Sequence, residues 1–117
     1  NTLLGMAIDP DTRRPRLSNV VGGLSGPAIR PVALKMVWDA AQVLSIPIIG
    51  TGGIGDADDA LQFLLAGATA VSVGSVTFRN PLAPVEVLEG IEAYLSRNGI
   101  ASVSDIIGKI EVPSEDT

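Results

Sequence analysis

Three glycine-rich segments of the sequence could bind an anion. They are Gly22-Gly23-Leu24-Ser25-Gly26, Gly50-Thr51-Gly52-Gly53 and Gly74-Ser75. Turns of this kind expose backbone N–H groups, and each segment precedes a predicted helix or helical turn whose N-terminus favours negative charge. The second and third segments each follow a predicted strand, one βα unit apart. We therefore expect the three segments to converge on a phosphorylated cofactor.

Each glycine turn also has a purely structural interpretation, because glycine often serves only the backbone angles or a close helix approach. No segment matches the G-x-G-x-x-G pattern of dinucleotide sites or the G-x-x-x-x-G-K-[ST] pattern of P-loops, so both classes are disfavoured. Asp56, Asp58 and Asp59 could suggest a metal site, but acidic residues in a first helical turn complement the helix dipole without a metal. We assign no metal ligands.

Apolar periodicity predicts the elements that must position these turns. The segment from Leu3 to Gly26 is rich in turn formers and is predicted to be a long irregular excursion, with a hairpin as one possibility. The elements expected after it are a helix from Gly26-Pro27 to Leu44, a strand Ile46–Thr51, a helix from Asp56 or Asp58 to Gly67, a strand Ala68–Gly74, a helix Val85–Ser96 and a short helix Val103–Ile110.

This order predicts an α/β fold in which helices cross over between parallel strands. Two strands cannot form a domain alone, and a (β/α)8 barrel needs about 250 residues. We therefore predict that residues 1–112 are the C-terminal part of such a barrel, incomplete in this chain, and that residues 113–117 are an acidic tail. The chain is expected to be a piece of a longer one.

Composition narrows the classes of function. The 117 residues are 46% apolar with a mean hydropathy of +0.39, which excludes a disordered chain, and the net charge of −5 disfavours nucleic acid and anionic membranes as partners. The sequence has no Cys and no His, so thiolate zinc sites, iron–sulfur clusters, disulfides and a histidine base are excluded within it. No apolar run approaches the ~20 residues of a membrane span, and we expect a soluble protein.

Four motifs make the sequence resemble the class 1 dihydroorotate dehydrogenases, and in particular their NAD-linked class 1B branch. The motifs are residues 1–9 (NTLLGMAID), 22–31 (GGLSGPAIRP), 50–54 (GTGGI) and 73–75 (VGS), and the likeness extends to about Gly99. The resemblance implies an FMN-bearing (β/α)8 barrel that oxidises dihydroorotate to orotate in pyrimidine (UMP) biosynthesis in the cytoplasm.

The resemblance also implies roles for particular residues. The implied substrate residues, which would hydrogen-bond orotate, are Asn1 and Thr2; the implied FMN residues are Gly26, which approaches the cofactor, and Gly52, Gly53, Gly74 and Ser75, which hold its phosphate. Position 75 is Ser where the family often has Thr, and the hydroxyl is retained. A structural interpretation of Asn1 and Thr2 is a helix or turn cap.

No residue of this chain is assigned as catalytic. The family's base and its flavin-contacting Lys are upstream of Asn1, and Arg30 and Lys35 are predicted to solvate the outer face of their helix. The resemblance further implies a separate electron-transfer subunit with FAD and a [2Fe–2S] cluster, NAD as acceptor, and a homo- or hetero-oligomer. The alternatives are another FMN- or phosphate-binding barrel and a catalytically inert fragment.

Overall fold

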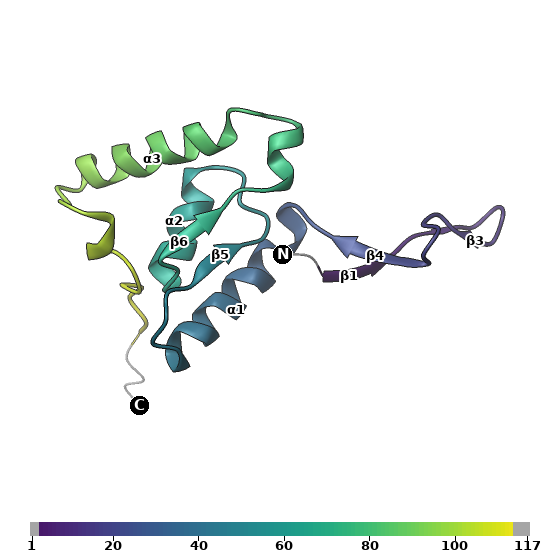
Figure 1. Ribbon diagram of the computed structural model, residues 1–117, viewed down its shortest axis with the longest axis horizontal. Coiled ribbons are helices and arrows are strands. Elements are labelled where there is room, and N and C mark those ends of the chain that lie inside the picture. The colour runs from purple at the N-terminus through teal and green to yellow at the C-terminus, as the bar shows by residue number, and fades with distance from the viewer. Residues whose placement is uncertain (1–2, 114–117) are drawn as a thin grey trace.

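The computed structural model describes residues 3–113 (Figure 1). It contains a small parallel sheet surrounded by helices and an antiparallel arm that extends away from them. The strands are β1 (Leu3–Met6), β2 (Ile8–Asp9), β3 (Arg14–Pro15), β4 (Val21–Leu24), β5 (Ile49–Thr51) and β6 (Ala70–Ser72). The α-helices are α1 (Arg30–Val43), α2 (Ala57–Ala66) and α3 (Ala83–Arg97), and the 3-10 turns are η1 (Pro27–Ile29), η2 (Ser75–Phe78) and η3 (Val103–Asp105).

The N-terminal excursion is a hairpin arm. Strand β1 pairs antiparallel with β4, with Leu3 opposite Leu24 and Met6 opposite Val21, and β2 pairs with β3 farther out. The hairpin possibility is therefore confirmed. In Figure 1 the arm leads away from the helices, and its Leu4 side chain is 84% exposed.

The parallel sheet sets the position of two of the glycine segments. Strands β5 and β6 pair in register, with Thr51 opposite Ser72. Both strands are shorter than predicted: β5 begins at Ile49 rather than Ile46, because Pro47 has no N–H to donate to a ladder. Since the strands run parallel, the turns that follow them emerge at the same edge of the sheet.

Helix boundaries follow local capping chemistry. Asp56 caps α2 by accepting a 2.9 Å hydrogen bond from the Asp59 amide, and Gly67 ends the helix at φ 122°, as its sequence position predicts. The predicted helix over Val103–Ile110 is wrong beyond Asp105. Gly108 adopts φ 69°. Its N–H donates to the Leu64 carbonyl at 3.0 Å, so this segment forms hydrogen bonds with carbonyls near the C-terminus of α2 instead of continuing as a helix.

The core lies where the three helices meet the sheet. Val37 of α1, Phe63 of α2 and Val87 of α3 are buried together with Ile54, which follows β5. Phe63 is fully buried and lies against Gly50, so that strand and helix approach closely. Within residues 3–113, no helix is long and apolar enough to cross a membrane.

We predict that the 117-residue polypeptide expressed alone does not unfold cooperatively. Strand β5 pairs only with β6 in the described part of the chain, and Ile49 on it is 68% exposed. A two-stranded sheet with open edges is marginal in water and favours association. Circular dichroism should show helical signal with a broad thermal transition, whereas a sharp two-state melt of a monomer would contradict this expectation.

Candidate functional site

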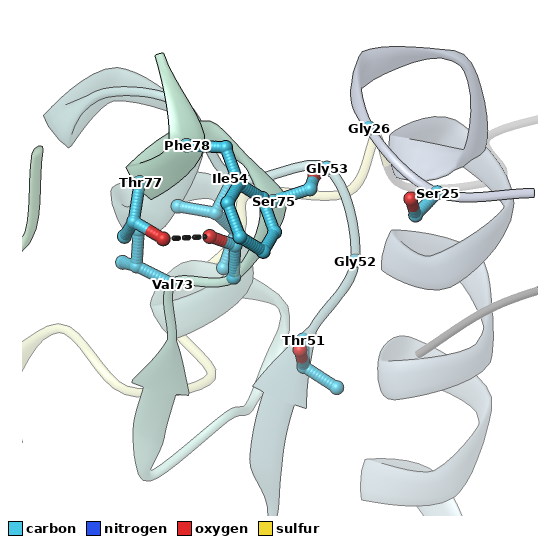
Figure 2. Close-up of a pocket in the computed structure, with 11 residues that line it drawn as sticks. Ser25, Gly26, Thr51, Gly52, Gly53, Ile54, Val73, Ser75, Thr77 and Phe78 are labelled. Carbon is cyan, nitrogen blue, oxygen red and sulfur yellow. Dashed lines mark hydrogen bonds between the residues drawn. The ribbon is translucent and has the colours of Figure 1, made fainter. Parts of the chain in front are cut away.

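A cavity of about 440 Å³ lies at the edge of the sheet where β5 and β6 end (Figure 2). Its walls come from three parts of the chain: the segment before η1, the turn after β5, and the segment from the end of β6 through η2. The lining residues are Ser25, Gly26, Thr51, Gly52, Gly53, Ile54, Val73, Gly74, Ser75, Thr77 and Phe78. The structure therefore brings Gly26, Gly52, Gly53, Gly74 and Ser75 together around one cavity.

Two of these glycines are required by the turn itself. Gly52 has φ 130°, and a Cβ there would lie 2.6 Å from the Cβ of Ala33. Gly53 has φ 72°, and a Cβ there would lie 2.6 Å from the carbonyl oxygen of Gly26. At both positions a larger residue would be strained and would push the turn away from α1. Gly52 and Gly53 are therefore needed for the backbone conformation and packing of the turn, independently of any ligand.

Gly74 differs from them. Its φ is −116°, and a Cβ at this position would meet no atom of the described chain within 4 Å. Packing within residues 3–113 therefore does not require a glycine here. Gly74 is exposed and lines the cavity.

The turns offer backbone donors to this cavity. Within residues 3–113, no hydrogen bond uses the amide N–H groups of Gly53, Ile54, Gly74 or Ser75. The hydroxyl of Thr77 donates to the Gly74 carbonyl at 2.7 Å, drawn as the dashed line in Figure 2. This hydrogen bond stabilises the turn after β6. Neutral N–H groups from two turns thus border the same space, an arrangement suited to the oxygens of a phosphate.

The N-terminus of α2 contributes less than predicted. The backbone N–H of Asp59, in the first turn of α2, donates to Oδ1 of Asp56. The backbone N–H of Gly55, just before the helix, donates to Oδ2 of Asp59 at 2.9 Å. Carboxylates of the chain itself therefore occupy this helix terminus. An anion in the cavity would meet the turn amides and not the end of α2.

An ion pair ties the start of α1 to the turn after β5. Arg30 contacts both carboxylate oxygens of Asp59 at 3.1 Å, and its Nη1 also donates to the Gly53 carbonyl at 3.3 Å. The prediction that Arg30 solvates the outer helix face is therefore wrong. Asp59 is only 7% exposed and needs a partner, which Arg30 supplies. Lys35 is exposed as predicted and pairs with Asp39 along the helix.

The sequence carried a signal for this pair. Asp59 precedes Phe63 by four residues and Ala66 by seven, and both are buried, so Asp59 falls on the inward face of α2. Asp58, by contrast, is exposed and accepts from Gln62 at 3.2 Å. Among residues 3–113, no three His, Cys, Asp or Glu side chains are grouped to hold a metal ion. Asn1 and Thr2, the predicted substrate residues, lie outside the described residues.

Parallel βα units with glycine turns gathered at the carboxyl ends of the strands define part of a (β/α)8 barrel. The chain belongs to the dihydroorotate dehydrogenase family: the family model described as "Dihydroorotate dehydrogenase" matches residues 1–95. This confirms the resemblance drawn from the four motifs and the predicted fold class.

Relatives and solved structures agree with this assignment. The chain is 60% identical over 111 residues to the "Dihydroorotate dehydrogenase B (NAD(+)), catalytic subunit" of Trichlorobacter lovleyi, covering 95% of this chain and 36% of that protein. It is 57% identical over 112 residues to the protein of the same name from Geotalea daltonii, covering 96% and 37%. The chain thus spans about a third of the length of these curated relatives.

A crystal structure of DHODH from Eimeria tenella in complex with ferulenol superimposes with a TM-score of 0.75. The sequence identity is 31%, and the match covers 93% of this chain and 29% of that one. The ligand-free enzyme of the same organism gives a TM-score of 0.74. The βα arrangement around the candidate site is therefore that of the family's barrel.

We predict that Asp59→Asn lowers the free energy of unfolding of the full-length protein by about 1–3 kcal/mol, because it leaves the Arg30 guanidinium without a charged partner. Chemical denaturation measures the change. Asp58→Asn is the matched control, since that exposed carboxylate should contribute less than about 0.5 kcal/mol. Equal stability of the wild type and the Asp59→Asn protein would show that the pair does not hold the turn.

Proposed function

We propose that the full-length protein oxidises dihydroorotate to orotate with FMN as cofactor, as a step of pyrimidine biosynthesis. In this proposal the chain described above contributes the phosphate side of the FMN site and part of the orotate site. The observation that carries it is the cavity at the ends of β5 and β6, where three glycine segments of a dihydroorotate dehydrogenase family chain meet.

The residues present fit the phosphate end of FMN. Unpaired amide groups at Gly53, Gly74 and Ser75, which all line the cavity, match an acceptor-only ligand. The cavity volume of about 440 Å³ lies within the range of small-ligand sites. When bound, FMN supplies the hydride-accepting chemistry that no side chain can perform.

The residues of this chain would act mainly by positioning. Amides from two turns would fix the phosphate and so orient the remainder of the cofactor toward the substrate. The amide of Asn1 and the hydroxyl of Thr2 would hydrogen-bond the ring and carboxylate of orotate, as the family resemblance implies. The catalytic base is proposed to lie outside these 117 residues, which contain neither Cys nor His.

We further propose that electrons leave through a second protein subunit. The relatives from Trichlorobacter lovleyi and Geotalea daltonii are named catalytic subunits of an NAD(+) enzyme, and that name implies a companion subunit. By the class 1B resemblance, the companion would carry FAD and a [2Fe–2S] cluster and reduce NAD, in a cytoplasmic hetero-oligomer. These 117 residues contain no Cys to ligate such a cluster.

Substitutions at Gly74 and Gly52 separate binding from folding. Gly74 lines the cavity, and a Cβ there would meet no atom of residues 3–113 within 4 Å, so Gly74→Ala should weaken FMN binding to the full-length apoprotein by roughly tenfold or more and destabilise the fold less than a change at Gly52 does. Gly52→Ala should instead destabilise the fold by about 1–3 kcal/mol, because its Cβ meets Ala33 at a positive φ. Flavin titration and thermal unfolding measure the two effects.

The proposal fails for the Gly74 turn if the Gly74→Ala protein binds FMN as tightly as the wild type. A loss of stability at Gly74 as large as at Gly52 would instead mean that the residue serves folding.

Asn1→Ala tests the substrate side. Removing the amide should leave polar atoms of orotate unpaired, at a cost of about 1–3 kcal/mol, so kcat/KM for dihydroorotate should fall roughly 5- to 150-fold in the full-length enzyme. FMN content should stay at the wild-type level. Steady-state kinetics on FMN-saturated enzyme decide the matter: an unchanged kcat/KM would refute the role, and a parallel loss of FMN would assign Asn1 to the cofactor.

A further inference from the structure

A second, smaller cavity of about 160 Å³ adjoins the first one. The two share Gly26, Gly53, Ile54 and Ser75, so the same turns border both. The smaller cavity is also lined by Gly55 and by Arg79, which follows η2. A basic residue therefore lines the region where the three glycine segments meet.

The charge around these turns needs a cation if the ligand is an anion. A phosphate monoester carries about −1.5 to −2 charges at pH 7. The turn amides are neutral dipoles, and the Asp59 carboxylate lies close enough to bond the Gly55 amide at 2.9 Å. A second carboxylate lies at this end of α2, because Asp56 caps the same helix. A dianion bound by amides alone would have no full positive charge beside it.

The other cation beside the turns is already engaged. Arg30 contacts both oxygens of Asp59 at 3.1 Å and the Gly53 carbonyl at 3.3 Å, so its charge is balanced by that carboxylate. Arg79 is exposed, and within residues 3–113 its side chain makes no hydrogen bond, ion pair or ring contact. Its charge is uncompensated where an anionic ligand needs it.

We propose that Arg79 is a ligand-binding residue that supplies the positive charge for the phosphate held by the glycine turns. The inference rests on the proposed function, because it takes FMN as the ligand. It adds a full positive charge, which the neutral turn amides do not supply, opposite the doubly charged phosphate. The site should prefer FMN to riboflavin, which has the same ring system and no phosphate, and Arg79 should be responsible for part of that preference.

Binding of the two flavins to the full-length apoprotein tests the proposal. Flavin fluorescence gives Kd for FMN and for riboflavin in the wild type, Arg79→Gln, Arg79→Met and Arg79→Lys. We expect the neutral variants to bind FMN roughly 10- to 100-fold more weakly, as for the loss of one charge-assisted hydrogen bond, with riboflavin unchanged. Arg79→Lys should recover part of the loss. Arg97→Gln is the matched control, since Arg97 is exposed and lies 5.6 Å from the Tyr94 ring.

The outcomes separate the two proposals. A wild type that binds FMN no more tightly than riboflavin would overturn the phosphate site, and with it the proposed function. A wild type that prefers FMN, with the preference retained in Arg79→Gln and Arg79→Met, would overturn only the role of Arg79. Equal weakening of both flavins would show that Arg79 supports the fold or pairs with a carboxylate elsewhere in the full-length protein. Both neutral variants replace an exposed side chain, so they should keep the wild-type Tm.

Discussion

The parallel pairing of β5 with β6 is the constraint on which the candidate site depends. With Thr51 opposite Ser72, the Gly52–Gly53 turn begins directly after one strand, and Gly74 follows the other after a single residue. Both turns therefore open at the same edge of the sheet (Figure 2). A shift of one residue in this register would turn the buried side chains of the strand to the wrong face and separate the turns.

Close contact between backbone segments brings the third glycine segment to this edge. Gly53 lies so near Gly26 that a Cβ would meet its carbonyl oxygen at 2.6 Å, and Arg30 joins the two segments through Asp59. This ion pair has a chemical consequence as well as a structural one. The Asp59 carboxylate accepts from Arg30 and from the Gly55 amide and not from the amides that line the larger cavity, which stay available to a ligand. Arg79 lines the smaller cavity without a charged partner among residues 3–113.

Sequence reasoning succeeded where the cause was local. The cap at Asp56, the helix end at Gly67 and the strand–turn–helix order follow from residue types within a few positions of one another. It failed where the cause was distant in the chain. The partner of Arg30 is 29 residues away, and the terminal segment is held by carbonyls of α2 at Leu64 and Leu65 and not by a helix of its own. The difference between Gly52 and Gly74 also requires the packed structure, since both follow strands.

We propose that one phosphate is held jointly by the turns after β5 and β6. A crystal structure of the full-length protein with FMN tests it most directly. We expect phosphate oxygens at about 2.7–3.2 Å from the amide nitrogens of both turns, including Gly53 and Ser75. A phosphate that contacts neither turn, or FMN bound elsewhere in the barrel, would contradict it.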